Sequence, residues 1–511
     1  MEGRPGGGGA LRKIWLPSIS DCFFIALIVW QFICGAGGWI SLLGDGDTGW
    51  HIRTGQYILE HHSVPTTDLF SFSRPGAPWF AWEWLTDVIY AVLFRMGGFK
   101  GIVLFAGVLI SIYATVLLRY TLWRGANPLV AISTTLLAVG ASSIHFLARP
   151  HLFTLVLLPV CWWIVEADRR ARTRWLWALI PLTALWTNLH GGFFIWLACL
   201  GLVVAGCALE AWRGADRRSD IQRYGMLFAG SAAASLVNPY GIRLQQHIFE
   251  FLRADWIKNL VQEFQAPTFR NEGQFQYELL LVAGLVTAGL LLRRRRMVEA
   301  LWVVFLAHCS LTSVRHAPIY AALAAPLIAC QLSHWWRTQA EKSSKSSAGA
   351  ILYQMGADLK DGFLRTSLWP AMLVGVLIAL DAPLHWPVDF PQQMFPVAMI
   401  GRHRDLVASG RLLTPDQWGD YIIYRFWPGQ RVYVDGRSDF YGQKLGEEYL
   451  HLLQGEWDWQ AIVERRGFDV ALLPVDWPLA SLLKREPAWQ VVEDDGKVIL
   501  FRRLRRQIAA K

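Results

Sequence analysis

Long apolar stretches recur along the first three quarters of the chain. Between Trp15 and Asp381, runs of mostly apolar residues alternate with short polar segments. A helix needs about 20 apolar residues to cross a bilayer, so this pattern predicts a multi-span membrane protein. Beyond this region the charged residues become frequent and the apolar runs become short. We therefore expect a mainly α-helical transmembrane domain over residues 1–382 and a small α/β domain over residues 383–511.

Four basic clusters between the apolar stretches predict the topology. They cover residues 169–174, 213–223, 293–296 and 337–365. Each neighbouring pair is separated by two apolar segments, so all four clusters lie on one face of the membrane. The positive-inside rule makes that face the cytoplasmic one. We expect residues 337–365 to form a flexible cytoplasmic loop, and a last span to carry the C-terminal domain to the outer face.

The first part of the chain decides the number of spans. Arg4, Arg12 and Lys13 precede an apolar stretch without a small-residue cleavage signature, which predicts an uncleaved anchor with a cytoplasmic N-terminus. The apolar segment 83–96 would rise only about 21 Å as a helix, less than the roughly 30 Å of a bilayer core. We expect a short or re-entrant helix there, and about eleven or twelve membrane segments in all.

The composition supports this interpretation and excludes several classes. Only 17% of the 511 residues are charged and 53% are hydrophobic, whereas ordinary soluble domains have about 25% charged residues. This excludes a soluble cytosolic enzyme, a disordered chain and a disulfide scaffold. The 27 tryptophans suit a protein with two lipid–water interfaces. The net charge of +9 is concentrated at helix ends, so we expect no nucleic-acid partner.

The first outer segment, residues 44–82, contains the clearest candidate chemistry. Asp45 and Asp47 stand two residues apart among glycines, and residues 48–61 have the pattern of an amphipathic helix on the membrane surface. Two such carboxylates can converge on a divalent cation or on an acceptor hydroxyl. The alternative is a solvated turn that caps the helix. Glu83 either pairs with Arg149 or Arg315 near the membrane boundary, or occupies a helix N-terminus.

Basic and histidine side chains are expected on the same outer face. Arginine binds phosphate oxygens with a planar fork of N–H groups, and neighbouring histidines add further donors. The group therefore suits a phosphate or pyrophosphate. Taken singly, each residue also has a structural explanation: an arginine at the end of a span can extend to the membrane interface, and a proline beside it can start a helix. The members of this candidate phosphate site are Arg149, His151, His190, Arg315 and His316.

The C-terminal region predicts a small α/β fold. Residues 431–435 and 469–475 have the pattern of buried strands, and residues 489–501 alternate around Asp495-Gly496, a typical hairpin turn. Helical patterns cover residues 447–453, 457–466 and 478–485. The loop from Asp435 to Asp439 follows a predicted strand, where α/β sheets commonly bind ligands. Internal pairing between aspartate and arginine explains this loop more simply.

Several segments together resemble a known superfamily. They are GDGDTGWHIRTGQYILEHHSVPTTDLFSF (44–72), RPH (149–151), NLHGGF (188–193), WGDYIIYRF (418–426) and RVYVDGRSDFYG (431–442). An acidic pair and a surface helix in the first outer loop, combined with an outer C-terminal domain, resemble the glycosyltransferase C superfamily. More narrowly, the segments look like a widespread group of multi-pass bacterial inner-membrane proteins assigned to it.

This resemblance implies a function. Members of the superfamily take a sugar from a polyprenyl-phosphate donor on the outer face of the cytoplasmic membrane. The acceptor here would be a glycan, a lipid or a protein of the envelope. The family role of base, or of ligand to Mg²⁺ or Mn²⁺, falls on Asp47 or Asp45. Many members also carry an acidic residue shortly before an Arg-Pro pair, whereas the stretch before Arg149-Pro150 has no carboxylate.

Two other functions remain open at this point. The missing second carboxylate favours a non-catalytic protein of the same architecture that acts in envelope assembly or partner binding. A lipid or polysaccharide transporter would need charged residues in the middle of its spans, and few are present beyond Asp21. No glycine-rich nucleotide loop or zinc-type spacing of cysteine and histidine appears. We therefore favour an inverting sugar transferase.

Overall fold

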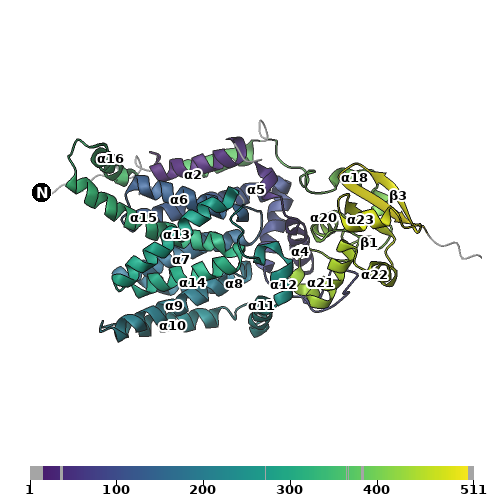
Figure 1. Ribbon diagram of the computed structural model, residues 1–511, viewed down its shortest axis with the longest axis horizontal. Helices are drawn as coiled ribbons and strands as arrows, with labels where there is room; N and C mark the ends of the chain where they lie inside the picture. The colour runs from purple at the N-terminus through teal and green to yellow at the C-terminus, as the bar shows by residue number, and fades with distance from the viewer. Residues whose placement is uncertain are drawn as a thin grey trace, which may run out of the picture. The chain divides into compact units, whose positions relative to one another are not determined.

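The computed structural model describes residues 15–34, 38–270, 272–363, 365, 367–380 and 385–504. The described part is mainly α-helical and has a small four-stranded sheet near its C-terminal end, as predicted (Figure 1). The basic residues expected to precede the first anchor, and the predicted domain boundary between residues 382 and 383, lie outside the described residues.

Six helices in the described part are long and apolar enough to cross a membrane. Three shorter apolar helices accompany them, at Ile19–Phe32, Met297–Thr312 and Trp369–Ala379. This set is compatible with a multi-pass membrane protein, whereas the predicted total of eleven or twelve segments stays a prediction. The six long helices are Trp84–Trp123, Pro128–His145, His151–Arg170, Phe193–Trp212, Gln274–Arg293 and Val314–Lys342.

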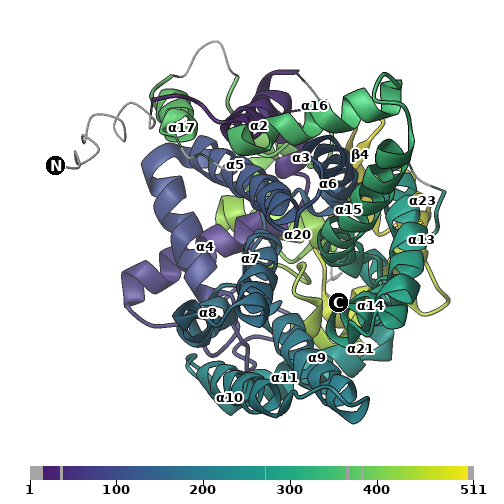
Figure 2. The ribbon, with the colours of Figure 1, turned by 90° about the vertical axis from the view of Figure 1, so that its left-hand side faces the viewer.

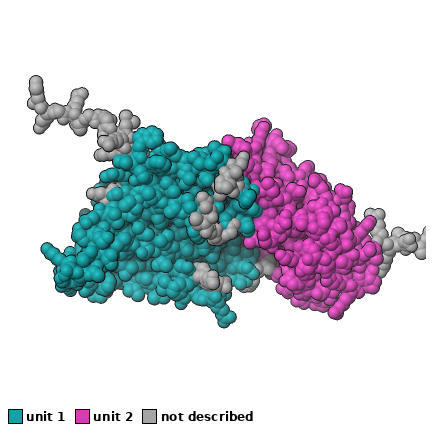
Figure 3. Space-filling view, turned by 90° about the horizontal axis from the view of Figure 1, so that it is seen from above, with its two compact units in different colours: residues 1–42, 103–241, 259–386 teal, residues 43–102, 242–258, 387–511 magenta. Residues whose placement is uncertain are grey.

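The chain forms two compact units, coloured separately in Figure 3. Unit 1 contains residues 1–42, 103–241 and 259–386, and unit 2 contains residues 43–102, 242–258 and 387–511. The first outer segment and the C-terminal region therefore belong to the same compact unit, although more than 300 residues separate them in the sequence.

Unit 1 consists of helices and contains most of the apolar ones. Helices α9, α14 and α13 run side by side, and α10 packs on α9 (Figures 1 and 2). Its elements are α2 (Ile19–Val29), η1 (Trp30–Cys34), α3 (Trp39–Leu42), α6 (Pro128–Ser142), η2 (Ser143–His145), α7 (His151–Arg170), η3 (Arg174–Ala178), α8 (Leu179–Leu189), α9 (Phe193–Trp212), α10 (Arg218–Ala234), η4 (Gln262–Phe264), α13 (Glu272–Arg293), α14 (Met297–Thr312), η5 (Val314–His316), α15 (Ala317–Lys342), α16 (Ala348–Phe363) and α17 (Trp369–Ala379).

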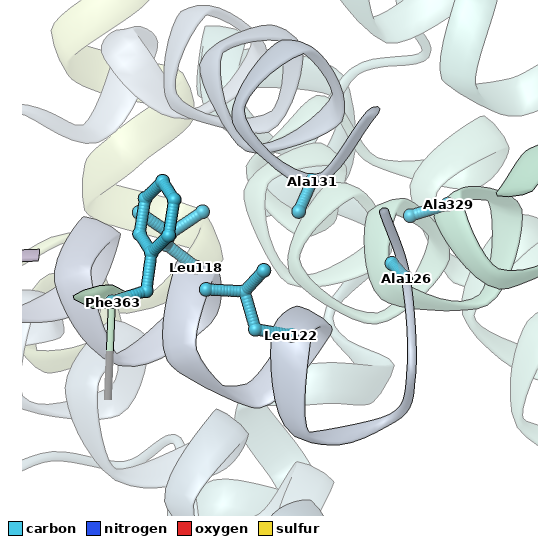
Figure 4. Packing of buried hydrophobic residues seen from close by; sticks show 6 residues of the cluster. All are labelled: Leu118, Leu122, Ala126, Ala131, Ala329 and Phe363. Carbon is cyan, nitrogen blue, oxygen red and sulfur yellow. The ribbon is translucent and has the colours of Figure 1, made fainter. Parts of the chain in front are cut away.

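A core cluster in unit 1 corrects one prediction. Residues 337–365 were expected to form a flexible loop, but α15 continues to Lys342 and α16 occupies most of the remainder. Phe363 at the end of α16 is buried against Leu118, Leu122 and Ala131 (Figure 4). The sequence was misleading because the serine- and lysine-rich stretch is short and precedes an amphipathic helix that packs on the bundle.

Helix α5 (Trp84–Trp123) contributes to both units. Its backbone leaves helical geometry at Gly97 and Gly98, and Gly98 has a φ of 58°, which glycine adopts without steric strain. The residues before this break belong to unit 2 and those from Val103 onward belong to unit 1. The segment 83–96, predicted as a short helix, is thus the first arm of a longer, interrupted helix.

Unit 2 is built around α4 and the C-terminal sheet. Helix α4, predicted at residues 48–61, covers Asp47–His61 and packs on α20. The hairpin and the helices predicted after residue 446 are confirmed. The other elements are α11 (Ile242–Arg253), α12 (Asp255–Leu260), α18 (Val397–Arg402), α19 (Arg404–Val407), β1 (Leu412–Leu413), α20 (Asp416–Phe426), α21 (Ser438–Gln454), α22 (Trp459–Arg466), β2 (Val470–Pro474), α23 (Pro478–Leu483), β3 (Trp489–Asp494) and β4 (Val498–Arg503).

The sheet has the strand order β1-β2-β4-β3. Strand β1 pairs with β2 in parallel, and β4 pairs antiparallel with both β2 and β3. The predicted strand at residues 431–435 is wrong, because only Val432 makes isolated bridges there, to Ser71 and Leu412. These bridges connect the first outer segment to the edge of the sheet, so the apolar run is buried without forming a ladder.

Candidate functional site

Asp45 and Asp47 lie at the N-terminus of α4. The backbone N–H of Asp47 donates to Oδ1 of Asp45 at 2.9 Å, and the indole Nε1 of Trp50 donates to Oδ1 of Asp47 at 3.2 Å. Both residues are buried, with exposed fractions of 8% and 5%. The helix dipole stabilises a carboxylate at this position. The two carboxylates thus lie at the start of the helix, as the alternative interpretation expected, but they are buried rather than solvated.

A further carboxylate, on Asp420 of α20, lies beside Asp47. The N–H of Gly436 donates to Oδ1 of Asp420 at 2.9 Å. A Cβ atom on Gly436 would lie 2.0 Å from Oδ1 of Asp47 and 3.0 Å from Oδ2 of Asp420, so both carboxylates converge on this glycine. Burial, followed by the negative charges of Asp47 and Asp435, raises the pKa of Asp420 well above its usual range. The neutral acid is therefore favoured at this position.

Arg437 supplies the positive charge of this region. Its Nε donates to Oδ1 of Asp435 at 2.7 Å, and its Nη2 donates to Oδ2 of Asp435 at 2.6 Å and to Oδ1 of Asp68 at 2.8 Å. The guanidinium is buried and its Cζ lies 4.5 Å from the ring centroid of Trp79. The Asp–Arg pairing predicted for this turn is confirmed, and it extends to a third residue from the first outer segment.

Glu83 directly precedes α5 and is linked to α4 through a histidine. Nδ1 of His51 lies 2.5 Å from Oδ1 of Asp87, and its Nε2 lies 3.7 Å from Oε2 of Glu83. His51 and Asp87 are both fully buried. His51 thus connects α4 to both acidic side chains at the start of α5. The pairing of Glu83 with Arg149 or Arg315 stays a prediction.

A cluster in unit 1 gathers the predicted basic residues around Glu263. Nη1 of Arg149 donates to Oε1 of Glu263 at 2.9 Å, and Cζ of Arg315 lies 4.3 Å from the ring centroid of the adjacent Phe264. Burial opposes ionisation of Glu263, but Arg149 and Arg315 outweigh it and hold its pKa at about 2. Glu263 is thus an anion that pairs with Arg149 and is stabilised by the charge of Arg315.

Histidines surround this ion pair at the ends of α7 and α8. The N–H of Gly192 donates to Nδ1 of His190 at 3.1 Å, and Oγ1 of Thr154 lies 2.7 Å from the same atom. Nδ1 therefore accepts, which places the ring proton of neutral His190 on Nε2. Nε2 of His151 donates to the carbonyl of His145 at 2.5 Å, and the His151 and His190 rings are 6.4 Å apart. His316 donates from Nδ1 to the carbonyl of Cys309 at 3.3 Å.

The comparisons with known proteins add no family. No protein-family model and no curated protein sequence matches this chain. The likeness to the glycosyltransferase C superfamily therefore rests on the quoted segments.

The predicted site residues fall into two groups. Unit 1 brings together Arg149, His151, His190, Arg315 and His316, whereas unit 2 holds Asp45, Asp47 and Glu83. Their convergence in one pocket stays a prediction. In the described part of the chain, no group of three or more histidine, cysteine or acidic side chains is arranged to hold a metal ion. The divalent cation that the sequence allowed at Asp45 and Asp47 stays a prediction.

Sequence reasoning missed Asp87, Glu263 and Asp420. Asp87 had a detectable signal, since it is a second carboxylate four residues after Glu83 in an apolar segment. Asp420 lies in an amphipathic helix, where a charged residue is usually exposed, whereas the structure buries it. Glu263 stands in a mixed polar segment where no pattern distinguishes it.

Proposed function

We propose that this chain is a membrane glycosyltransferase that takes a sugar from a polyprenyl-phosphate donor. The acceptor would be an envelope glycan, lipid or protein on the outer face of a bacterial cytoplasmic membrane. The main support is the cluster of Arg149, Arg315 and histidines around Glu263, at the ends of apolar helices. Two arginines that already hold one anion offer the donors that a phosphate group requires.

In this proposal the donor phosphate replaces the Glu263 carboxylate between the two arginines. His190 carries its proton on Nε2 and adds a neutral donor. The acceptor hydroxyl attacks the anomeric carbon and loses its proton to Asp47. The bond between that carbon and the phosphate oxygen breaks, a glycosidic bond forms with inversion, and the polyprenyl phosphate leaves with the bonding electron pair. The two arginines stabilise the negative charge that this phosphate gains.

A lipid-retention experiment tests the phosphate assignment. The full chain is purified in a mild detergent, and co-purified lipids are identified by native mass spectrometry. We expect a polyprenyl-phosphate species with the wild type and its loss with Arg149→Gln/Arg315→Gln. Arg218→Gln, an exposed arginine at the start of α10, is the matched control and should retain the lipid. Equal retention by the double variant would contradict the assignment.

A transfer assay tests the base. The retained donor lipid, with its sugar, is incubated with envelope fractions, and transfer of the sugar to the envelope material is followed for the wild type and for Asp47→Asn. Asparagine preserves an acceptor for the Trp50 indole but removes the basic oxygen, so we expect unchanged expression and loss of transfer. Transfer at the wild-type rate in Asp47→Asn/Asp45→Asn would refute the role given to the acidic pair.

One observation favours a second candidate, a non-catalytic envelope protein. Asp45 and Asp47 are buried and engaged at a helix terminus, as structural carboxylates are. If this function is correct, Asp47→Asn restores the phenotype of a deletion strain as well as the wild type does. A loss of complementation with normal protein levels supports the transferase instead.

A further inference from the structure

Unit 1 contains a strongly basic cavity that the proposed transfer reaction does not use. It has a volume of about 360 Å³, and its charged lining consists of seven arginines and three glutamates. This volume lies within the range of about 300–1,000 Å³ typical of small-molecule sites. The excess of arginines over glutamates makes an anion the ligand that the lining selects.

The three glutamates of the cavity are occupied by neighbouring arginines. Arg169 lies 3.3 Å from Glu210 through Nη2 and 3.1 Å from Glu299 through Nη1. Arg217 lies 2.9 Å from Glu210, and Arg296 also pairs with Glu299. Glu166 pairs with Arg124, which is not one of the lining residues. These acidic side chains are nearly fully buried, so they hold the inner arginines in place rather than repel a ligand.

The other four lining arginines have no carboxylate partner within the described residues. Arg170 stacks on Trp123 with Cζ 3.9 Å from the ring centroid, and Arg213 contacts the sulfur of Met297 at 3.8 Å. Arg294 and Arg295 form the turn between α13 and α14, where Arg295 adopts a φ of 58°, a conformation that is strained for a side chain of this size. Four exposed arginines that no described carboxylate neutralises thus line one cavity.

The cavity lies far from the cluster around Glu263. Helix α7 runs from His151, in that cluster, to Arg170, in the cavity, and its 20 residues span about 30 Å. Helix α9 likewise ends at Trp212, beside Arg213, and 80% of the Trp212 surface is exposed. Tryptophan at the end of an apolar helix is typical of the headgroup level of a membrane. The cavity is at the helix ends that the basic clusters predict to be cytoplasmic.

We propose that this cavity binds a phosphate-bearing anion, with the headgroup of an anionic phospholipid as its source. Four arginines that have no carboxylate partner among the described residues supply N–H donors for phosphodiester oxygens, and Trp212 places them at the depth of lipid headgroups. A soluble pyrophosphate offers the same oxygens without acyl chains. This site is independent of the proposed transferase activity, since it lies at the opposite helix ends.

Binding to the purified full chain tests the proposal. The protein is delipidated in detergent, and native mass spectrometry titrations use cardiolipin, phosphatidylglycerol, phosphatidylcholine and inorganic pyrophosphate. Each arginine near an anionic headgroup contributes about fivefold in affinity. Arg213→Gln/Arg294→Gln should therefore weaken the binding of cardiolipin by about 25-fold. Arg293→Gln is the matched control, because Arg293 is exposed in the same basic run but does not line the cavity.

The outcomes separate the sources and the alternatives. Tight cardiolipin or phosphatidylglycerol binding that only the double variant weakens supports a lipid headgroup. Pyrophosphate binding with the same variant pattern supports the phosphate site but overturns the lipid source. Equal weakening by Arg293→Gln, or equal binding of phosphatidylcholine, overturns the proposal, because a diffuse basic surface explains either result. Size-exclusion profiles confirm that the exposed substitutions leave the fold intact.

Discussion

Replacing Gly436 by alanine moves the carboxylate that the proposed reaction requires. A Cβ at this position would lie 2.0 Å from Oδ1 of Asp47, whereas real Cβ atoms keep at least 3.0 Å. The Asp47 carboxylate is the nearest group, so it must move away by about 1 Å to restore an ordinary contact. Its hydrogen bond from Trp50 at 3.2 Å is lost as it moves.

The two expected effects of Gly436→Ala differ in size. Overpacking of this kind costs about 1–3 kcal/mol, which lowers the melting temperature of a unit of this size by roughly 2–12 °C. A displacement of about 1 Å at a reacting group costs about 100-fold in rate. We therefore expect a folded protein that has lost most of its transfer activity.

The assay compares initial rates of transfer from the retained donor lipid with thermal unfolding in detergent. Gly401→Ala is the matched control, because its Cβ would meet open space in the same unit. A transfer rate within twofold of the wild type in Gly436→Ala, with a structure that shows Asp47 displaced, would refute Asp47 as the base. An equal loss in Gly401→Ala would show that the effect is not local.

Three further predictions concern stability. Arg437→Met leaves Asp435 and Asp68 buried without their counterion, which should lower the free energy of unfolding by about 3–5 kcal/mol. Arg465→Gln, at an exposed pair with Glu448, should lower it by less than about 1 kcal/mol. Thermal unfolding of both variants measures the difference. The pKa of Asp420 is raised, so the wild type should lose stability as the pH rises above the usual aspartate range. Asp420→Asn should remove that loss. Melting temperatures of the wild type and the variant that change in parallel between pH 4 and 8 would contradict this. The pKa of Glu263 is lowered from 4.5 to about 2, so its ion pair with Arg149 stabilises the fold above pH 4.5 and is lost as the pH falls towards 2. The difference in melting temperature between the wild type and Glu263→Gln should shrink as the pH falls from 4.5 towards 2. A difference that stays constant would show that the ion pair is not its source.

Hydrophobic periodicity predicted much of the fold because it reports local structure. The apolar segments are helices, α4 begins within one residue of its expected start, and the Asp495-Gly496 hairpin is present. The strand expected at residues 431–435 failed because an apolar run is buried equally well as an irregular segment between a sheet edge and a loop. The helix α16 was missed because its polar flanks dominated the composition of the segment.

The candidate site was only partly predictable because its chemistry depends on distant partners. The arginines and histidines of unit 1 could be grouped from the alternation of apolar and basic segments. Glu263, which holds Arg149, carries no local signal. The contact of Asp47 with Gly436 and Asp420 joins residues that lie far apart in the chain, and only tertiary packing reveals it.

The Asp68–Arg437 pair has a consequence for biosynthesis. The two residues are 369 positions apart, and ribosomes add about 5–20 residues per second, so roughly 20–75 s separate their synthesis. Throughout that interval the early loop carries an acidic side chain whose counterion does not yet exist. This contact therefore cannot form before Arg437 has been made, and an isolated C-terminal fragment would leave Arg437 with only one of its two anions.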